Sequence, residues 1–188
     1  MRIVGGKWRG KKLENIGSQV DTKEFRPTLD RVKESLFNIL IHGPYPNIAG
    51  KRVLDLFSGT GSLGLEALSR GADEACFVEL NRSALKILKT NIANFHLGEE
   101  VKVFHGDATK LRRNLDESFG LIFLDPPYNK GLGELALISA SQGHWISKGS
   151  IVVWEENSAI KVPSGFELIE TRFFGKTKIN ILIFNGQF

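Results

Sequence analysis

The fold of this chain is decided by the stretch Phe119-Gly120-Leu121-Ile122-Phe123-Leu124-Asp125-Pro126-Pro127-Tyr128. Four consecutive apolar residues, 121–124, are typical of a parallel strand that is buried on both faces. Neither proline can donate to a sheet, so the strand has to end before them. The sequence therefore predicts a stiff loop at the carboxyl end of a buried strand, where open α/β sheets bind ligands. A rigid turn without function is the alternative, but Gly, Asn or Ser would suffice for that.

From residue 51 onward, predicted strands alternate with predicted helices. The strands are 52–57, 74–79, 101–105, 119–124 and 150–154, and the helices are 62–70, 82–95, 132–141 and a short one around 108–115. Short connections between such elements predict an α/β fold, a doubly wound and mostly parallel sheet with helices on both faces. Segments 166–174 and 178–184 flank a tight turn, so we expect the sheet to end in an antiparallel hairpin.

The composition bounds the class of protein. With 188 residues, 41% of them hydrophobic, the chain predicts one globular domain with at most a small appendage. No apolar run reaches the length of a membrane span, and the first residues do not resemble a secretory signal. The single cysteine, Cys76, cannot form an internal disulfide, and the four histidines lack metal-ligand spacing. We therefore expect a cytoplasmic protein without a metal site.

Positive charge is concentrated at the N-terminal end. Residues 1–33 hold nine Lys and Arg against four acids, whereas the rest of the chain holds 16 against 17. We expect residues 1–45 to form a basic extension and residues 46–188 to form the main domain. Within the extension, residues 1–15 predict a small β-hairpin, and residues 29–41, capped by Thr28, predict an amphipathic helix.

The basic extension indicates a polyanionic partner. Cationic side chains beside an aromatic ring are typical of contacts with phosphates and unstacked bases. The candidate RNA-binding residues are Arg2, Lys7, Trp8, Arg9, Lys11 and Lys12. Two alternatives stay open: Trp8 is equally suited to anchor the hairpin by packing, and the charge is also compatible with a solubilising surface.

A glycine-rich loop follows the first predicted strand, in the sequence Asp55-Leu56-Phe57-Ser58-Gly59-Thr60-Gly61-Ser62-Leu63-Gly64. Its three glycines satisfy G-x-G-x-x-G, the pattern of dinucleotide-binding proteins. On that pattern alone a nicotinamide-dependent dehydrogenase is one hypothesis. Asp55 favours another, because a carboxylate at the strand end opposes a pyrophosphate and suits a ligand with an amino group.

Two more acids follow predicted strands. Glu79 ends the second strand, at the position where an acid binds ribose hydroxyls. Asp107 follows the third strand and is placed to accept a proton from an adenine amino group, although it is also a good helix N-cap. Asp55 and Asp125 follow two further strands in the same way. Four acids at four strand ends are poorly explained as four independent helix caps, so we infer a ligand site along the carboxyl edge of the sheet.

These residues together resemble a known family. The loop 55–61, Glu79, Asp107 and the Asp-Pro-Pro-Tyr loop, in that order, resemble class I S-adenosylmethionine-dependent methyltransferases that modify amino groups. The start of the chain and the segment Arg26-Pro27-Thr28-Leu29-Asp30-Arg31-Val32-Lys33-Glu34-Ser35-Leu36-Phe37-Asn38 resemble the RsmD family, whose members methylate the N2 amine of one guanine in bacterial 16S ribosomal RNA. Gly5 departs from this pattern, where alanine or another small residue is expected.

The resemblance implies S-adenosylmethionine as the cofactor and assigns the residues. Asp55 faces the methionyl amino group, Glu79 holds the ribose, and Asp107 with Ala108 meets the adenine. The other implied cofactor-binding residues are Phe57, Ser58, Gly59, Thr60, Gly61, Leu80, Arg26 and Thr28. The implied catalytic residues are Asp125, Pro126, Pro127 and Tyr128: Asp125 and the Pro126 carbonyl accept from the target amine, and Tyr128 stacks on the guanine.

The resemblance also implies the partner, 16S ribosomal RNA, either free or within an assembling small ribosomal subunit, and neither a membrane nor a metal. We expect the enzyme to be a monomer. Three alternatives remain at this stage. They are an adenine-N6 or protein-glutamine methyltransferase, a nicotinamide oxidoreductase, and an RNA-binding module without catalysis.

Overall fold

The computed structural model describes residues 1–15, 25–128 and 130–186, and for residues 25–29 it describes the backbone alone. Within these ranges the strands are β1 (Arg52–Leu56), β2 (Glu74–Glu79), β3 (Val101–His105), β4 (Phe119–Leu124), β5 (Ile146–Glu156), β6 (Phe166–Phe174) and β7 (Thr177–Phe184). The helices are α1 (Phe25–His42), α2 (Ser62–Ser69), α3 (Arg82–Asn94) and α4 (Leu132–Gln142), with 3₁₀ turns η1 (Gly6–Trp8) and η2 (Ala108–Lys110).

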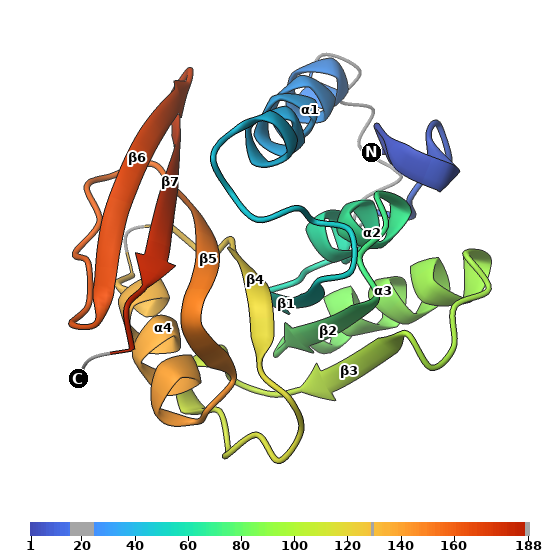
Figure 1. Cartoon of the computed structure of the whole chain (residues 1–188). Coiled ribbons are helices and arrows are strands. Elements are labelled where there is room, and N and C mark those ends of the chain that lie inside the picture. Colours follow the sequence, from blue (N-terminus) through green and yellow to red (C-terminus); the bar gives the residue numbers. More distant parts are fainter. Residues whose placement is uncertain (16–24, 129, 187–188) are drawn as a thin grey trace.

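All seven strands of the described residues form one sheet in the order β3-β2-β1-β4-β5-β7-β6 (Figure 1). Strands β1 to β5 are parallel, whereas β7 pairs antiparallel with both β5 and β6. The prediction of a doubly wound, mostly parallel sheet that ends in an antiparallel hairpin is confirmed. The chain reverses its direction of winding beside β1, which has β2 on one side and β4 on the other.

Alternating side chains bury both faces of the sheet. One face packs against α1, α2 and α3, where Phe37 of α1 contacts Phe123 of β4 with ring centroids 5.6 Å apart. The other face packs against α4 and η2, through Leu137 and Ala108. Burial on both faces explains why these strands are nearly continuous apolar runs.

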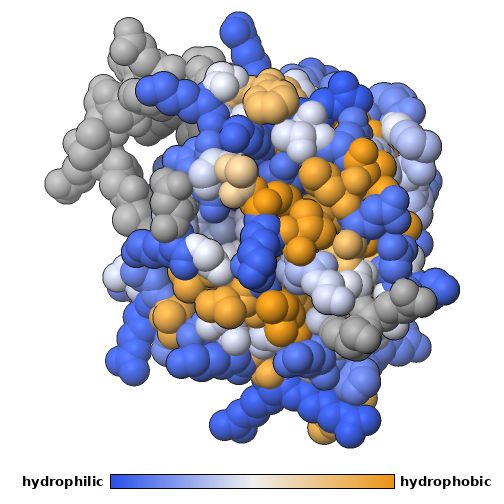
Figure 2. All heavy atoms as spheres, turned by 90° about the vertical axis from the view of Figure 1, so that its left-hand side faces the viewer, coloured by the Kyte–Doolittle hydropathy of each residue, from blue (hydrophilic) through white to orange (hydrophobic). Residues whose placement is uncertain are grey.

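The edge strand β6 is less buried than the central strands, because much of it is open to solvent. Leu168, Ile169 and Phe173 are exposed on it. Figure 2, which views the β6 side of the molecule, shows apolar side chains interspersed with charged ones. Glu167 and Arg172 lie on the same strand. Charges of this kind discourage pairing of an exposed edge with another chain.

Three predicted elements differ from the structure. Strand β5 begins at Ile146, four residues before the predicted start, and ends at Glu156. Helix α1 begins at Phe25, four residues before the prediction, so Thr28 lies inside the helix and does not cap it. Pro27 stands in the first turn, where a proline costs no hydrogen bond. The helix predicted around 108–115 is only the turn η2. After this turn the backbone is no longer helical and forms hydrogen bonds with side chains of other elements. The Leu111 N–H donates to Ser139 Oγ, and the Arg112 carbonyl accepts from Trp145 Nε1.

The N-terminal segment, residues 1–15, folds back on itself like a hairpin. Arg2 and Lys12 form an antiparallel bridge, the Ile3 N–H donates to the Lys11 carbonyl at 2.9 Å, and η1 lies near the turn. Ile3 is fully buried and Leu13 is 6% exposed, both in the core beneath α1 and α2. The segment is therefore an integral part of the domain core.

A buried carboxylate fixes this segment to α2. Glu66 is fully buried, and its two oxygens each accept an N–H at 2.8 Å, from Val4 and from Gly5. Arg70 donates to the same carboxylate at 2.8 Å, and Lys33 of α1 lies 3.5 Å from it. Burial lowers the pKa of Lys33, and the neighbouring Glu66 opposes that shift. One side chain thus joins the N-terminal segment, α1 and α2.

The backbone of the segment approaches α2 closely. The Ser69 hydroxyl donates to the Gly5 carbonyl at 2.6 Å and accepts from the Trp8 N–H at 3.0 Å. At Gly6, φ is +74°, and a Cβ would lie 1.9 Å from the Ser69 carbonyl oxygen. Only glycine fits there.

We expect Glu66→Ala to lower the free energy of unfolding by about 3–5 kcal/mol, because it leaves the N–H groups of Val4 and Gly5 without their acceptor and the buried Lys33 without its opposite charge. Urea denaturation measures the change. Glu99→Gln, at an exposed acid after α3, is the control and should change stability by less than about 0.5 kcal/mol. Equal stability of the two variants would contradict the role of Glu66.

Candidate active site

The candidate site lies where the carboxyl ends of the central strands meet. In the sheet, Asp55 is paired with Phe123 and Leu56 with Leu124, so the loops after β1 and β4 begin side by side. This is the point at which the winding of the sheet reverses, and ligands of open α/β sheets bind at such points. The structure therefore brings the glycine loop and the Asp-Pro-Pro-Tyr loop together.

The glycine loop is held by Glu79. The Gly59 N–H donates to Glu79 Oε2 at 2.7 Å, and the Asn81 N–H donates to Oε1 at 2.6 Å. Glu79 is 9% exposed, and each of its oxygens keeps a lone pair for a further donor. The carboxylate thus shapes the loop and can accept from a ligand hydroxyl.

The glycines of this loop serve different purposes. At Gly59, where φ is +55°, a Cβ would meet no atom within 4 Å, so its open side permits a ligand to approach the backbone. At Gly61 a Cβ would lie 2.4 Å from Leu88, and at Gly64 it would lie 2.4 Å from the Phe77 ring. Gly61 and Gly64 are thus required for packing of α2 and α3 against the sheet.

Asp55 is almost completely buried at the end of β1, with 2% of its surface exposed. Its Oδ2 accepts the Gly64 N–H at 2.9 Å. Burial raises the pKa of Asp55 to about 7, the Gly64 hydrogen bond lowers it, and the negative Glu79 raises it further. A cationic ligand group beside Asp55 would favour the ionised form.

Asp107 follows β3 and caps η2. Its Oδ1 accepts from the Thr109 N–H at 2.9 Å and from the Thr109 hydroxyl at 2.7 Å, and the latter bond lowers the pKa of Asp107. The capping interpretation is therefore observed, and Oδ2 remains for a ligand donor. Leu80 is 61% exposed beside this strand end, and Ala108 is buried beneath it. An exposed leucine there is suited to cover a flat apolar ring.

The Asp-Pro-Pro-Tyr loop carries a ring held in place by an acid. The Tyr128 hydroxyl donates to Glu155 Oε1 at 2.8 Å, and the ring is 39% exposed. Glu155 lies at the carboxyl end of β5, next to β4 in the sheet. The bond fixes the ring and leaves its surface available for stacking.

Several carboxylates surround Asp125. Crowding by protein atoms raises its pKa, and the negative charges of Glu155, Asp55 and Glu156 raise it further. Asp125 is nevertheless exposed at the surface, so solvent reaches it. A carboxylate with a raised pKa is a better proton acceptor near neutral pH. The site can thus accept hydrogen bonds and a proton from a substrate amine.

Sequence reasoning missed two site residues. Glu155 follows the apolar run 150–154, so the same acid-after-strand signal that located Asp125 was present there. Asn91 of α3 is fully buried, donates to the Thr60 carbonyl at 3.0 Å and to the Glu14 carbonyl at 3.2 Å, and accepts from the Glu14 N–H. It thereby joins the glycine loop to the N-terminal segment, and no sequence pattern indicated this.

The candidate RNA-binding residues lie along the N-terminal segment. The Trp8 ring packs edge-to-face on Phe95, with the ring centroids 4.9 Å apart, and the Lys7 ammonium lies over the Trp8 ring, 4.3 Å from its centroid. The anchoring role of Trp8 is therefore observed. Lys11 donates to the Asn94 carbonyl. Arg2, Arg9 and Lys12 are exposed on the same segment. The side chains of Arg26 and Thr28 lie outside the described part of the structure.

No cluster of His, Cys, Asp and Glu in the described ranges is arranged to hold a metal ion. Among the described helices, none has the length and apolar character needed to cross a membrane.

The site fits S-adenosylmethionine. An acid buried at the β1 end suits an amino group, Gly59 leaves its backbone open, and Glu79 has lone pairs for ribose hydroxyls. Strand order and site together define a class I S-adenosylmethionine-dependent methyltransferase.

The chain belongs to the family described as Conserved hypothetical protein 95, whose model matches residues 1–183. It is 34% identical over 179 residues to ribosomal RNA small subunit methyltransferase D of Escherichia coli, covering 94% of this chain and 86% of that protein. It is 33% identical to YlbH of Bacillus subtilis, covering 92% and 91%. The solved structure of Escherichia coli yhhF superposes with a TM-score of 0.82 and 30% identity, over 100% of this chain and 99% of the other.

We expect Asp55→Asn to stabilise the protein without ligand at pH 8 by on the order of 2 kcal/mol, because it removes a buried charge. The pKa of Asp55 is about 7 in the folded protein and 3.8 for an ordinary aspartate, so the wild type loses stability as pH rises from about 4 to 7. The variant should lose this dependence and bind S-adenosylmethionine more weakly. Thermal unfolding at several pH values tests the first point, and calorimetry tests the second. A variant less stable than wild type at pH 8 would contradict the assignment.

Proposed function

We propose that this protein transfers a methyl group from S-adenosylmethionine to the N2 amine of a guanine in 16S ribosomal RNA. The observation that carries the proposal is the Asp-Pro-Pro-Tyr loop beside Asp55, on a chain with 34% identity to ribosomal RNA small subunit methyltransferase D. The acids along this edge have a purpose in such a reaction and none in hydride transfer.

In this proposal, residues at the carboxyl ends of the strands bind the cofactor. Asp55 binds the methionyl amino group, Glu79 binds the ribose, and Asp107 with Leu80 and Ala108 borders the adenine. Gly59 allows the cofactor to lie against the loop formed with Phe57, Ser58, Thr60 and Gly61. When bound, S-adenosylmethionine supplies a methyl group on a positively charged sulfur.

The loop after β4 prepares the acceptor. The exocyclic amine of guanine is a weak nucleophile, because its lone pair is conjugated with the ring. Asp125 and the Pro126 carbonyl accept its two N–H groups and turn the lone pair toward the methyl group, while Pro127 keeps the loop stiff. Tyr128, held by Glu155, stacks on the base. Orientation of this kind supplies on the order of 7–11 kcal/mol of the barrier reduction in favourable cases.

The base has to leave its helix to reach Asp125. We infer that residues 1–45 form an RNA-binding extension of a methyltransferase domain, residues 46–188. Arg2, Lys7, Arg9, Lys11 and Lys12 neutralise phosphates near the target, and Trp8 contributes an aromatic edge. The substrate is the RNA of a small subunit, free or during assembly in the cytoplasm, and the enzyme acts as a monomer.

We expect Asp125→Ala to lower the rate of methyl transfer to 16S ribosomal RNA at least about 100-fold, by loss of an acceptor that orients the amine. Binding of S-adenosylhomocysteine, measured by calorimetry, should remain. Asp73→Ala, at an exposed acid before β2, is the control and should keep full activity. Nucleoside analysis of the product identifies the base. N6-methyladenosine in place of N2-methylguanosine would refute the proposed target.

We expect the triple variant Lys7→Gln, Arg9→Gln and Lys12→Gln to bind RNA more weakly and with a smaller salt dependence. Removal of three phosphate contacts lowers the slope of log K against log salt by about 2 on single strands. Deletion of the whole segment is unsuitable, because Ile3 and Leu13 belong to the core.

The control for this prediction replaces the exposed cations Arg113, Lys148 and Lys161 by Gln. Fluorescence anisotropy with a labelled RNA fragment measures both triple variants over a range of salt concentrations. Equal slopes in the two variants would remove the N-terminal segment from the RNA-binding surface.

A further inference from the structure

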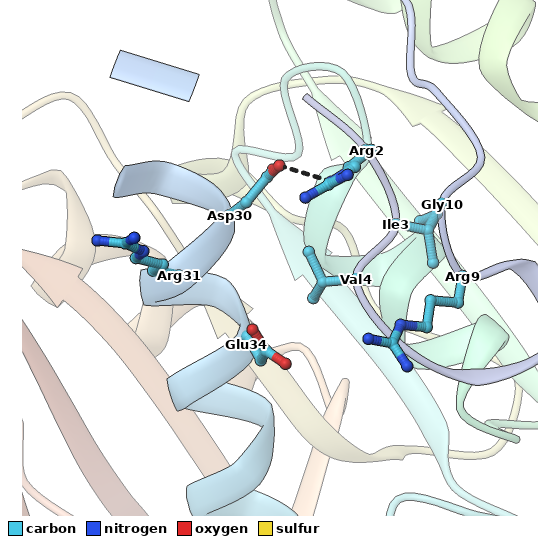
Figure 3. A pocket seen from close by; sticks show the side chains of 8 residues that line it. All are labelled: Arg2, Ile3, Val4, Arg9, Gly10, Asp30, Arg31 and Glu34. Carbon is cyan, nitrogen blue, oxygen red and sulfur yellow. Dashed lines mark hydrogen bonds and ion pairs between the residues drawn. The ribbon is translucent and has the colours of Figure 1, made fainter. Parts of the chain in front are cut away.

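A second cavity, distinct from the candidate active site, lies between the N-terminal segment and α1. It has a volume of about 340 Å³, within the range of small-ligand sites. Figure 3 shows its two walls: Arg2 and Arg9 come from the N-terminal segment, and Asp30, Arg31 and Glu34 come from α1. Backbone and apolar atoms of Ile3, Val4 and Gly10 complete the lining.

One acceptor in this cavity has no donor. Asp30 Oδ2 accepts from Arg2 Nε at 3.0 Å, whereas Asp30 Oδ1 is buried without a hydrogen-bond partner. Among buried side-chain atoms of the described residues, only Trp154 Nε1 shares this condition. A buried acceptor without a donor is costly. Because solvent does not reach Oδ1, a ligand in the cavity donates to it only once the Asp30 side chain turns.

The other charges of the cavity are also available. Within the described residues, no ion pair engages Arg9, Arg31 or Glu34, and all three are exposed. Glu34 lies one helical turn after Asp30, so the two carboxylates share one face of α1. The cavity therefore presents carboxylates on the α1 side and the guanidinium groups of Arg2 and Arg9 on the opposite side, whereas the Arg31 side chain points away from them (Figure 3).

Guanine is the base that matches this pattern. Its Watson–Crick edge offers N1–H and N2–H donors to carboxylates, and its O6 and N7 accept from an arginine. Adenine and cytosine offer a single amino group, and uracil offers one imino proton. A further arginine suits the phosphate of the same nucleotide.

We propose that this cavity binds an unpaired guanine nucleotide of the RNA substrate, separate from the guanine that is methylated. Asp30 and Glu34 accept from its Watson–Crick edge, and Arg9 and Arg31 contact its O6, N7 and phosphate. The site rests on the proposed function for the identity of the RNA. With this site, the enzyme would recognise two nucleotides of one RNA substrate, the methylated guanine and the guanine in the cavity.

Anisotropy with two short labelled oligouridines, one with a single guanine and one with a single adenine, tests the proposal. The wild type should bind the guanine-containing strand more tightly, by about 5- to 150-fold. Glu34→Gln and Asp30→Asn should reduce this preference at least about fivefold and leave the affinity for the adenine strand unchanged. Arg31→Gln should weaken binding of both strands.

Glu99→Gln is the matched control and should preserve the preference. Glu34 is exposed, so its variant should fold, and thermal unfolding checks this. A preference that survives Glu34→Gln and Asp30→Asn but is lost in Asp125→Ala would overturn the proposal, because the catalytic loop would then read the base.

The binding measurement and the methylation assay test the cavity assignment and the proposed function independently. A protein that prefers guanine through Glu34 but never methylates RNA would refute the proposed function and leave the cavity assignment intact. A protein that methylates guanine without any contribution from Glu34 and Asp30 would refute the cavity alone.

Discussion

The buried carboxylate of Glu66 is the interaction on which the arrangement of this protein depends. It accepts backbone N–H groups of the N-terminal segment, and it lies beside Lys33 of α1 and Arg70 of its own helix. Lys33 also donates to Ser62 Oγ, at the start of α2 directly after the glycine loop. The elements proposed to bind RNA and the loop proposed to bind the cofactor therefore share one buried polar network.

The sheet edge concentrates negative charge where the reaction is proposed to occur. Asp55, Asp125 and Glu155 all have raised pKa values because each is crowded by protein atoms, and neighbouring acids add to this for Asp55 and Asp125. Such a site is unfavourable for folding and suited to a cationic cofactor, since the ligand supplies the missing positive charge. Without the cofactor these acids repel one another, and in its presence they bind its positive charge.

The strands of the sheet and most acids of the candidate site could be predicted from the sequence, because buried strands leave a clear apolar pattern. Strands such as β2 and β4 are apolar on both faces, so their bounds matched the structure at both ends. The acids after them were located because each ends an apolar run. Glu66 and Asn91 could not be found in this way, because their roles depend on partners more than 60 residues away in the sequence. Thr28 misled the prediction of α1 because a good capping residue also occurs within a helix.

The burial of Ile3 and Leu13 has a consequence for how such enzymes can diversify. An appended recognition module can be exchanged between catalytic domains when a linker is all that connects them. Here the N-terminal segment contributes two side chains to the core and takes its hydrogen bonds from Glu66, Ser69 and Asn91. A graft of the segment alone onto another methyltransferase would leave its backbone without acceptors. With the RNA-binding role proposed for this segment, substrate choice would be inherited together with the catalytic domain, and new specificity would arise by substitution within the segment.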